Sequence, residues 1–253
     1  MLFLLRAVFV VIWMLLGLLL VLSIFRFFPS PYRLAINRQW SRVLMCLCGV
    51  RIRVLGEPRL QGPALWVANH VSWLDVFVLN TVRPTAFVAK SEIRNWPLLG
   101  WLVAGSGTVF IERGQRHAVR RVGHQMQARF KEGGAIGLFP EGTTSSGLDV
   151  GPFHSSLFDA AIRSHVDIQP VALRFFHRGR RSDYVAFVGE QSLLQNLWRL
   201  LGTTGVAVEL EFPPAMDGEF CEEHGRSSVA AHAHHVIRQA VVVREAGEVA
   251  RCS

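Results

Sequence analysis

The distribution of apolar and polar residues divides the chain into an apolar N-terminal part and a longer part with alternating patterns. Residues 7–25 carry no charge. A helix of that length covers roughly 28 Å, close to the ~30 Å hydrocarbon core of a bilayer. The sequence FRFFPSPYR that follows has no small-residue cleavage site, which disfavours a secretory signal. We therefore expect residues 1–55 to form a membrane-anchoring helical segment.

Basic residues near the apolar run predict its orientation. Arg6 precedes the run, and four arginines follow it: Arg26, Arg33, Arg38 and Arg42. Because positive flanks stay on the cytoplasmic side, the bulk of the protein is expected on the cytoplasmic side of the inner membrane. Residues 32–49 mix arginines with apolar residues, as in an amphipathic helix that lies on a membrane. Two arrangements remain open: the first helix crosses the bilayer, or it enters one leaflet and returns.

Beyond Gly56 and Pro58, short apolar runs predict strands and longer periodic segments predict helices. The expected strands are residues 51–55, 64–68, 86–89, 108–111, 135–139, 168–174, 184–188 and 206–212. The expected helices include residues 73–79, 116–131, 156–164 and 227–243. Because strands alternate with helices, residues 56–253 are predicted to form one α/β domain. Its sheet should be mixed, partly parallel and flanked by helices.

Composition and charge narrow the possible partners. Half of the residues are hydrophobic, mean hydropathy is +0.28, and the net charge is +8. No basic-aromatic reading motif is present, so anionic membrane lipid suits this charge better than nucleic acid. The basic face of helix 116–131 is either solvated, or a docking surface for anionic headgroups or an acidic carrier protein. No paired Cys-x-x-Cys pattern exists, and His232, His234 and His235 are interpreted as helix surface rather than a metal site.

The clearest chemical signal is a histidine and an aspartate inside the apolar stretch WVANHVSWLDVFVLN. His70 follows an expected strand, and Asp75 falls in the first turn of the next helix. On one continuous helix this pair would diverge, whereas a loop can fold the imidazole onto the carboxylate. Such a pair makes a general base whose carboxylate fixes the tautomer. A competing interpretation is that Asp75 only caps the helix, together with Ser72.

The chain offers no obvious nucleophile of its own. The spacing Gly-x-Ser-x-Gly is absent, and GTTSSG does not replace it. The attacking hydroxyl is therefore expected to belong to a substrate, which predicts transfer to an acceptor alcohol. Two alternatives stay open at this point: a serine hydrolase or thioesterase that uses Ser145 with His70, and a non-catalytic membrane scaffold.

Two further polar clusters follow apolar strands. GTVFIERG places Arg113 at a strand exit, and GLFPEGTTSSG places Glu141 and Gly142 at another. In these stretches the chain resembles the lysophospholipid acyltransferase family, typified by 1-acylglycerol-3-phosphate O-acyltransferase. Four family motifs match in order, as NHVSWLD, FIER, FPEG and IQPV, within residues 64–171.

The resemblance implies a glycerolipid acyltransferase fold and a set of roles. His70 would be the general base, oriented by Asp75, and the acceptor hydroxyl would attack the thioester of acyl-CoA or acyl-carrier protein. The residues implied in substrate binding are Phe110, Arg113, Glu141, Gly142, Thr143 and Pro170. Family enzymes need no metal and no bound cofactor, so the expected partners are membrane lipids, a lysolipid acceptor and the acyl donor.

The chain departs from family members that act on lysophosphatidic acid. Thr144 stands where those members usually carry an arginine, and His154, Ser155 and Ser156 stand where basic residues often follow Pro-Phe. Two expected phosphate partners are thus missing, and charge-assisted contacts are the strong ones for a phosphate monoester. The pattern resembles the lyso-ornithine lipid branch of the family, whose acceptor has an amino-acid headgroup. In that branch, Arg113 would bind the carboxylate of the headgroup. Both lysophosphatidic acid and lyso-ornithine lipid remain possible acceptors.

Overall fold

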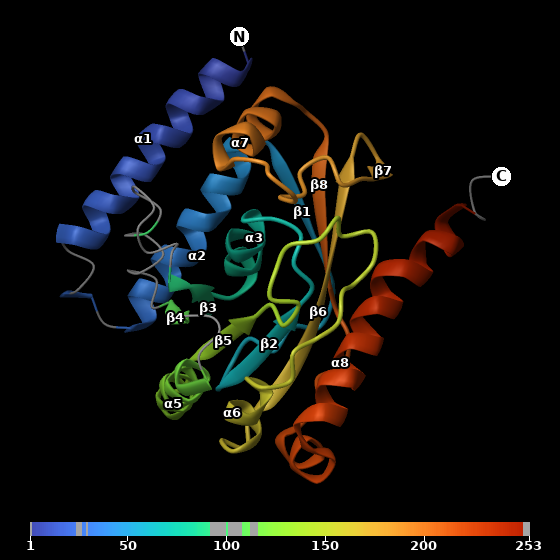
Figure 1. Ribbon diagram of the computed structural model, residues 1–253. Helices are drawn as coiled ribbons and strands as arrows, with labels where there is room; N and C mark the ends of the chain where they lie inside the picture. Colours follow the sequence, from blue (N-terminus) through green and yellow to red (C-terminus); the bar gives the residue numbers. More distant parts are fainter. Residues whose placement is uncertain are drawn as a thin grey trace.

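An eight-stranded mixed sheet forms the centre of the described part of the chain, and helices cover both of its faces (Figure 1). The computed structural model describes residues 2–23, 27–28, 30–91, 100, 108–111 and 116–249. The strands are β1 (Val50–Gly56), β2 (Ala64–Ala68), β3 (Ala86–Lys90), β4 (Val109–Ile111), β5 (Ala135–Leu138), β6 (Asp167–His177), β7 (Arg180–Arg181) and β8 (Val206–Phe212). Their order is β1-β8-β6-β2-β5-β3-β4, with β7 paired to β6.

The sheet is parallel in its centre and antiparallel toward one edge. Strand β2 pairs parallel with both β5 and β6, and β3 pairs parallel with β5 and β4. Strand β8 pairs antiparallel with β6 and parallel with the edge strand β1. The predicted fold class, a mixed and partly parallel sheet flanked by helices, is confirmed.

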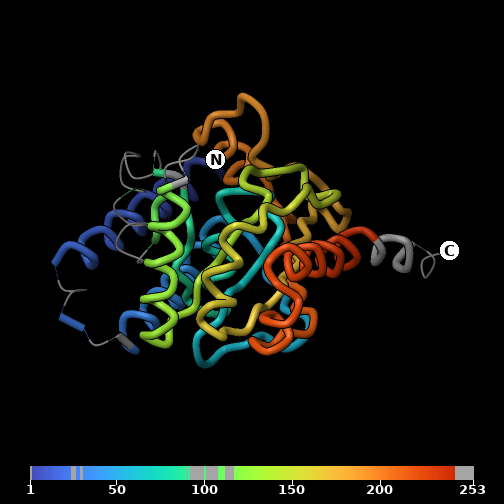
Figure 2. Tube along the Cα trace, turned by 60° about the horizontal axis from the view of Figure 1, so that its bottom comes forward, coloured from blue at the N-terminus to red at the C-terminus, as the bar shows by residue number. Residues whose placement is uncertain are grey.

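Helices pack on the two faces of the sheet as two separate groups. The helices are α1 (Leu2–Ser23), α2 (Ser30–Leu47), α3 (Leu74–Val82), α5 (Arg116–Lys131), α6 (Phe158–Ile162), α7 (Leu193–Gly202) and α8 (Gly218–Val249). Residues of α1, α2, α3 and α7 join one hydrophobic cluster, and residues of α5, α6 and α8 join the other. Figure 2 shows α1 and α8 on opposite sides of the molecule.

Strand β2 holds the two clusters apart and ends at the predicted site. All five of its residues are buried, as expected of a central strand covered on both faces. Trp66 points into the cluster of α1, α2 and α3, whereas Leu65 and Val67 point into the cluster of α5, α6 and α8. Burial of each such side chain contributes roughly 1.5–3 kcal/mol. This packing fixes the position at which β2 delivers His70.

Most expected elements agree with the structure, but one expected strand is wrong, and helix α7 and strand β7 were not expected. The bounds of β2, β8 and α5 match the prediction residue for residue, and the other expected elements that form differ by at most three residues at either end, except α8, which extends nine residues earlier and six residues later. The strand expected at residues 184–188 is wrong, because these residues form a turn and a loop. The side-chain amide of Asn196 donates to the carbonyls of Val185 and Ala186, so this backbone is satisfied without a sheet partner.

The two N-terminal helices pack against each other and against the catalytic part of the chain. By length and composition alone, α1 could cross a membrane, with a mean hydropathy of 2.7. The indole N–H of Trp13 donates to the carbonyl of Trp40 at 3.2 Å, and Gly17 leaves room for the Trp40 ring. This apolar helix indicates membrane association. The division into segments 1–55 and 56–253 stays a prediction.

Candidate active site

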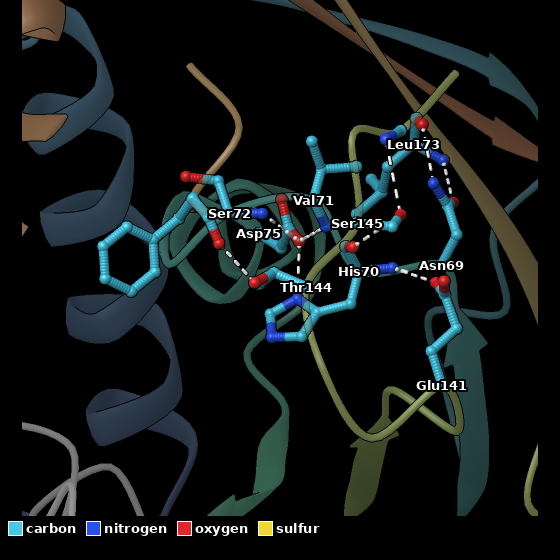
Figure 3. A network of polar contacts seen from close by, with 11 residues as sticks. Asn69, His70, Val71, Ser72, Asp75, Glu141, Thr144, Ser145 and Leu173 are labelled. Atoms are coloured by element: carbon cyan, nitrogen blue, oxygen red, sulfur yellow. Dashed lines mark hydrogen bonds and ion pairs between the residues drawn. The ribbon is translucent and has the colours of Figure 1, made fainter. Parts of the chain in front are cut away.

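His70 and Asp75 lie in contact at the carboxyl end of β2, as the sequence predicts (Figure 3). Nδ1 of His70 is 2.7 Å from Oδ2 of Asp75. The Asp75 side chain is fully buried, and the His70 side chain is 20% exposed. The pair therefore joins a protected carboxylate to an imidazole that a substrate can reach.

The carboxylate contacts determine the tautomer of the imidazole. Oδ2 of Asp75 also accepts hydrogen bonds from the peptide N–H groups of Val71, at 2.7 Å, and Ser72, at 3.0 Å. An oxygen that accepts two peptide donors acts as an acceptor toward His70 as well, so Nδ1 carries the proton. Nε2 then holds the lone pair, and no residue in the described part of the chain hydrogen-bonds to it. This is the arrangement of a general base.

Of the two hydrogen bonds expected in a capping box between Ser72 and Asp75, the structure contains one. The Asp75 carboxylate accepts from the backbone of Ser72, but among the described residues the Ser72 hydroxyl has no hydrogen-bond partner. Trp73 is the N-cap residue of α3 and makes no side-chain capping hydrogen bond. One oxygen thus ties the loop before α3 and orients the imidazole, so the two roles coexist.

Glu141 holds the main chain of His70 from the neighbouring strand. It follows β5, which pairs with β2, and its Oε1 accepts the peptide N–H of His70 at 2.7 Å (Figure 3). Its Oε2 accepts the peptide N–H of Gly151 at 2.9 Å. Burial raises the pKa of this carboxyl, while the hydrogen bonds from His70 and Gly151 act against the shift. Both oxygens are thus engaged by backbone donors in a largely buried position.

The loop after Glu141 is bonded to the main chain around His70. The Ser145 peptide N–H donates to the His70 carbonyl at 2.8 Å, and the Ser145 hydroxyl donates to the same carbonyl at 3.2 Å. Thr144 donates its hydroxyl to the carbonyl of Phe187, whose own N–H donates to the Val71 carbonyl. The Ser145 hydroxyl is therefore bonded to the His70 backbone rather than to its ring, which argues against its use as a nucleophile.

Two residues outside the predicted set also position His70. The Phe139 ring stacks on the imidazole, with 4.1 Å between ring centroids. The Asn69 side-chain amide donates to the Leu173 carbonyl and accepts from the Leu173 N–H, which joins the end of β2 to β6. Phe139 belongs to the FPEG stretch and Asn69 precedes His70, so both lay within the quoted motifs. Their contacts, however, depend on strand register.

The remaining predicted site residues fall at different distances from this centre. Arg113 lies outside the described residues. Phe110 is on the edge strand β4, with β3 and β5 between it and β2. Gly142 has a φ of 73°, which suits glycine, and Thr143 next to it is exposed.

Pro170 lies inside β6, where proline would normally interrupt a ladder. It is paired in register with Val67 of β2. Ile168 exchanges both of its backbone hydrogen bonds with Met216, on the opposite side of β6 from β2. Pro170 is two residues after Ile168, so its backbone nitrogen points to the same side of β6. The antiparallel pairing of β6 with β8 starts only at Ala172. The missing N–H therefore leaves no strand partner unsatisfied.

His232, His234 and His235, in the middle of α8, do not gather as a metal site would require. His234 lies edge-on to Phe153 and 3.3 Å from the Val150 carbonyl, whereas His232 lies near Phe220. Among the residues that the structure describes, no group of three histidine, cysteine or acidic side chains is placed to hold a metal ion.

Comparison with known proteins identifies the family of the chain. The acyltransferase family matches residues 51–174. The lyso-ornithine lipid O-acyltransferase of Pseudomonas aeruginosa is 34% identical over 212 residues, which cover 84% of this chain and 80% of that protein. The chain therefore belongs to the acyltransferase family, and it is an enzyme of that class.

Other relatives carry two different names. The lyso-ornithine lipid O-acyltransferase of Rhizobium meliloti is 36% identical over 200 residues, covering 71% of this chain and 66% of that protein. The 1-acyl-sn-glycerol-3-phosphate acyltransferase of Neisseria gonorrhoeae is 34% identical over 172 residues, covering 67% of each. The crystal structure of the 1-acyl-sn-glycerophosphate acyltransferase of Thermotoga maritima has the same fold. Its TM-score is 0.63 at 18% identity, over 93% of this chain and 96% of that one.

Proposed function

We propose that the protein transfers a fatty acyl group from an acyl thioester to the free hydroxyl of a lysolipid. The observation that carries this proposal is the His70–Asp75 pair, with Nδ1 held at 2.7 Å from the carboxylate and the His70 side chain 20% exposed. Nε2 takes the proton of the acceptor hydroxyl while that oxygen attacks the thioester carbonyl carbon. The tetrahedral intermediate then expels the thiolate, which takes the proton from the imidazolium.

Asp75 supports both halves of this cycle. Its carboxylate keeps the proton on Nδ1 while Nε2 acts as the base, and it stabilises the imidazolium that forms. Two peptide N–H groups hold the carboxylate in place, so it does not reorganise during the reaction. We infer that acyl-carrier protein or acyl-CoA is the co-substrate and that the reaction needs no metal or bound cofactor.

Lyso-ornithine lipid is the acceptor we propose, ahead of 1-acylglycerol-3-phosphate. Thr144 replaces the arginine that the phosphate-specific pattern carries, and its hydroxyl is bonded to the Phe187 carbonyl. The relatives support the same choice, since the one from Pseudomonas aeruginosa matches over a larger share of this chain than the one from Neisseria gonorrhoeae. Ornithine offers a carboxylate in place of the phosphate. We place the reaction on the cytoplasmic side of the inner membrane, because basic residues flank the apolar helix.

An acceptor panel tests this proposal. Full-length enzyme in detergent is given labelled acyl-carrier protein with lyso-ornithine lipid or with lysophosphatidic acid, and His70→Ala serves as the blank. We expect turnover of lyso-ornithine lipid at least roughly tenfold faster, because Thr144 offers no positive charge where the phosphate-specific pattern carries an arginine. A strong preference for lysophosphatidic acid would overturn the acceptor assignment, and turnover by the blank would overturn the role of His70.

A further inference from the structure

Helix α7 presents an unusually exposed apolar face. Leu194 is 77% exposed and Trp198 is 62% exposed, the highest values among large apolar residues that the structure describes beyond residue 32. Because they are four residues apart, they lie on the same side of the helix. The other side is buried, with Asn196, Leu200 and Leu201 facing inward. An exposed leucine and tryptophan on a short helix are costly in water and call for an apolar partner.

This face is continuous with the outer surface of α1. The ring of Phe3 lies 4.0 Å from the ring of Trp198, centroid to centroid. From there the exposed apolar side chains of α1 continue along the helix: Leu4, Leu5, Val8, Val11, Ile12, Leu15, Leu16 and Leu19. Figures 1 and 2 both place the beginning of α1 beside α7. The two helices therefore share one apolar surface.

A single charged residue fixes α1 in this position. Arg6 turns inward, and its guanidinium donates to the Thr203 carbonyl at 2.5 Å and to the Leu201 carbonyl at 3.5 Å. These carbonyls lie at the carboxyl end of α7, where the helix dipole favours a cation. The inward turn also removes the positive charge of Arg6 from the apolar face. Further along, Trp13 and Gly17 pack on Trp40, so α1 is attached to the rest of the protein near its start and again at its middle.

We propose that α7 is a second membrane-contacting element, and that Leu194 and Trp198 insert into the leaflet that also holds α1. This rests on the membrane association proposed for α1 and extends it to the catalytic part of the chain. Tryptophan suits the boundary between headgroups and acyl chains. Arg199 is exposed, with its guanidinium 5.5 Å from the centroid of the Tyr184 ring, and adds a cation near this face for anionic headgroups. The occupant is therefore a bilayer surface that contains anionic lipid, in line with the net charge of +8.

The inward side of α7 connects this contact to the catalytic loop. Oδ1 of Asn196 accepts the indole N–H of Trp73 at 2.9 Å, and its amide donates to the Ala186 carbonyl at 3.1 Å. The next residue, Phe187, donates its N–H to the carbonyl of Val71, which adjoins His70. Insertion of α7 thus sets the height of the His70 loop above the leaflet from which a lipid acceptor arrives.

The test uses full-length protein in vesicles of zwitterionic and anionic phospholipid. One cysteine for labelling replaces Leu194 in one variant and Leu60 in the control, and each carries an environment-sensitive fluorophore. Both variants also carry Cys46→Ser and Cys252→Ser, while Cys48 and Cys221 are buried. Leu60 is a matched control because it is 50% exposed and precedes β2, at the opposite end of that strand from the catalytic loop. We expect lipids brominated in their acyl chains to quench the probe at 194, and aqueous iodide to quench the probe at 60.

Two results would overturn the proposal. If iodide quenches both probes equally, α7 faces water. If neither iodide nor brominated lipid reaches the probe at 194, a protein surface covers it, such as a second copy of the chain. Because quenching does not depend on turnover, failure here is distinguishable from failure of the proposed reaction.

A kinetic measurement gives an independent readout. In the double variant Leu194→Ser with Trp198→Ser, we expect KM for a lysolipid in vesicles to rise roughly tenfold, because apolar insertion is lost. The kcat in detergent micelles should stay unchanged, since neither residue touches the reacting groups. An unchanged KM in vesicles would contradict the proposal.

Discussion

At the scale of single residues, one carboxylate oxygen organises the catalytic loop. Oδ2 of Asp75 accepts three donors, from His70, Val71 and Ser72, within 3.0 Å. The other oxygen, Oδ1, is buried and has no hydrogen-bond partner in the described part of the chain. Asp75 therefore does two separable things: it holds the loop as an acceptor, and it stabilises charge on the imidazole. Substitutions at this one position can distinguish them.

Asp75→Asn should keep the fold and lose the charge. The amide oxygen can replace Oδ2 and accept all three donors, while the amide nitrogen takes the place of Oδ1. We expect kcat to fall roughly a hundredfold, because imidazolium stabilisation is lost, and the melting temperature to stay above that of Asp75→Ala, because the loop keeps its acceptor. Asp75→Ala should lose more activity and also stability, since each orphaned buried N–H costs about 1–3 kcal/mol. Equal melting temperatures for the two variants would show that the loop does not depend on this acceptor.

Glu141→Gln tests whether His70 must be held through its peptide N–H. Both oxygens of Glu141 accept from backbone N–H groups. The glutamine side chain has one oxygen and one NH2 group, so its NH2 group must face one of these two N–H donors. The resulting shift of the His70 loop should lower kcat roughly ten- to a hundredfold, because catalytic groups tolerate little displacement. Steady-state assays on folded variant protein measure this. If instead KM for the acceptor rises and kcat stays constant, Glu141 binds substrate as the resemblance implies.

At the scale of elements, the structure shows which features the sequence could predict. His70 and Asp75 were predictable because they are five residues apart and each follows a clear local pattern. The bonds from Glu141 and Ser145 to the His70 backbone were not, since they depend on the register of β5 beside β2. Helix α7 was missed, although Ser192 and Gln195 form a reciprocal capping box that marks its start.

The turn after Ser145 gives a prediction at this scale. Gly147 has a φ of 74°, and a Cβ there would lie 2.6 Å from Val71 Cγ2, next to His70. Gly147→Ala should therefore lower both stability and kcat. Gly62→Ala is the matched control, because its φ is 69° and nothing lies within 4 Å of the added Cβ. The control should lose only about 1–2 kcal/mol of stability from the left-handed backbone. Equal kcat values for the two variants would contradict a steric path to His70.

At the scale of the whole molecule, an apolar surface on α1 and α7 lies on the sheet face that also carries α3, whose first turn supplies Asp75. The general fold followed from the sequence because strands and helices alternate clearly along residues 50–212. The placement of α1 did not follow, since it depends on Arg6 reaching the carboxyl end of α7. Apolar length alone left two arrangements of the first helix open: it crosses the bilayer, or it enters one leaflet and returns.

The pH dependence of stability gives a prediction for the whole protein. Burial raises the pKa of Glu141 above 4.5, so the folded state binds this proton more tightly than the unfolded state. The contribution of Glu141 to the free energy of unfolding therefore falls as pH rises from 4.5 through the raised pKa. Asp149 acts oppositely and at lower pH, because Arg238 lowers its pKa below 3.8. Melting curves should show wild type losing stability relative to Glu141→Gln above pH 4.5, and a relative gain would contradict this.

The measurement that tests the central claim most directly is a single-turnover assay of His70→Ala. Enzyme in excess is mixed with a labelled acyl thioester and the lysolipid acceptor, and both product and protein-bound acyl group are followed. The account predicts a rate lower by roughly 10²–10⁴ in a folded variant, as expected for loss of a general base. It also predicts no acyl-enzyme in wild type, because the nucleophile is the acceptor hydroxyl. Near-normal transfer by His70→Ala, or a trapped acyl group on Ser145, would contradict it.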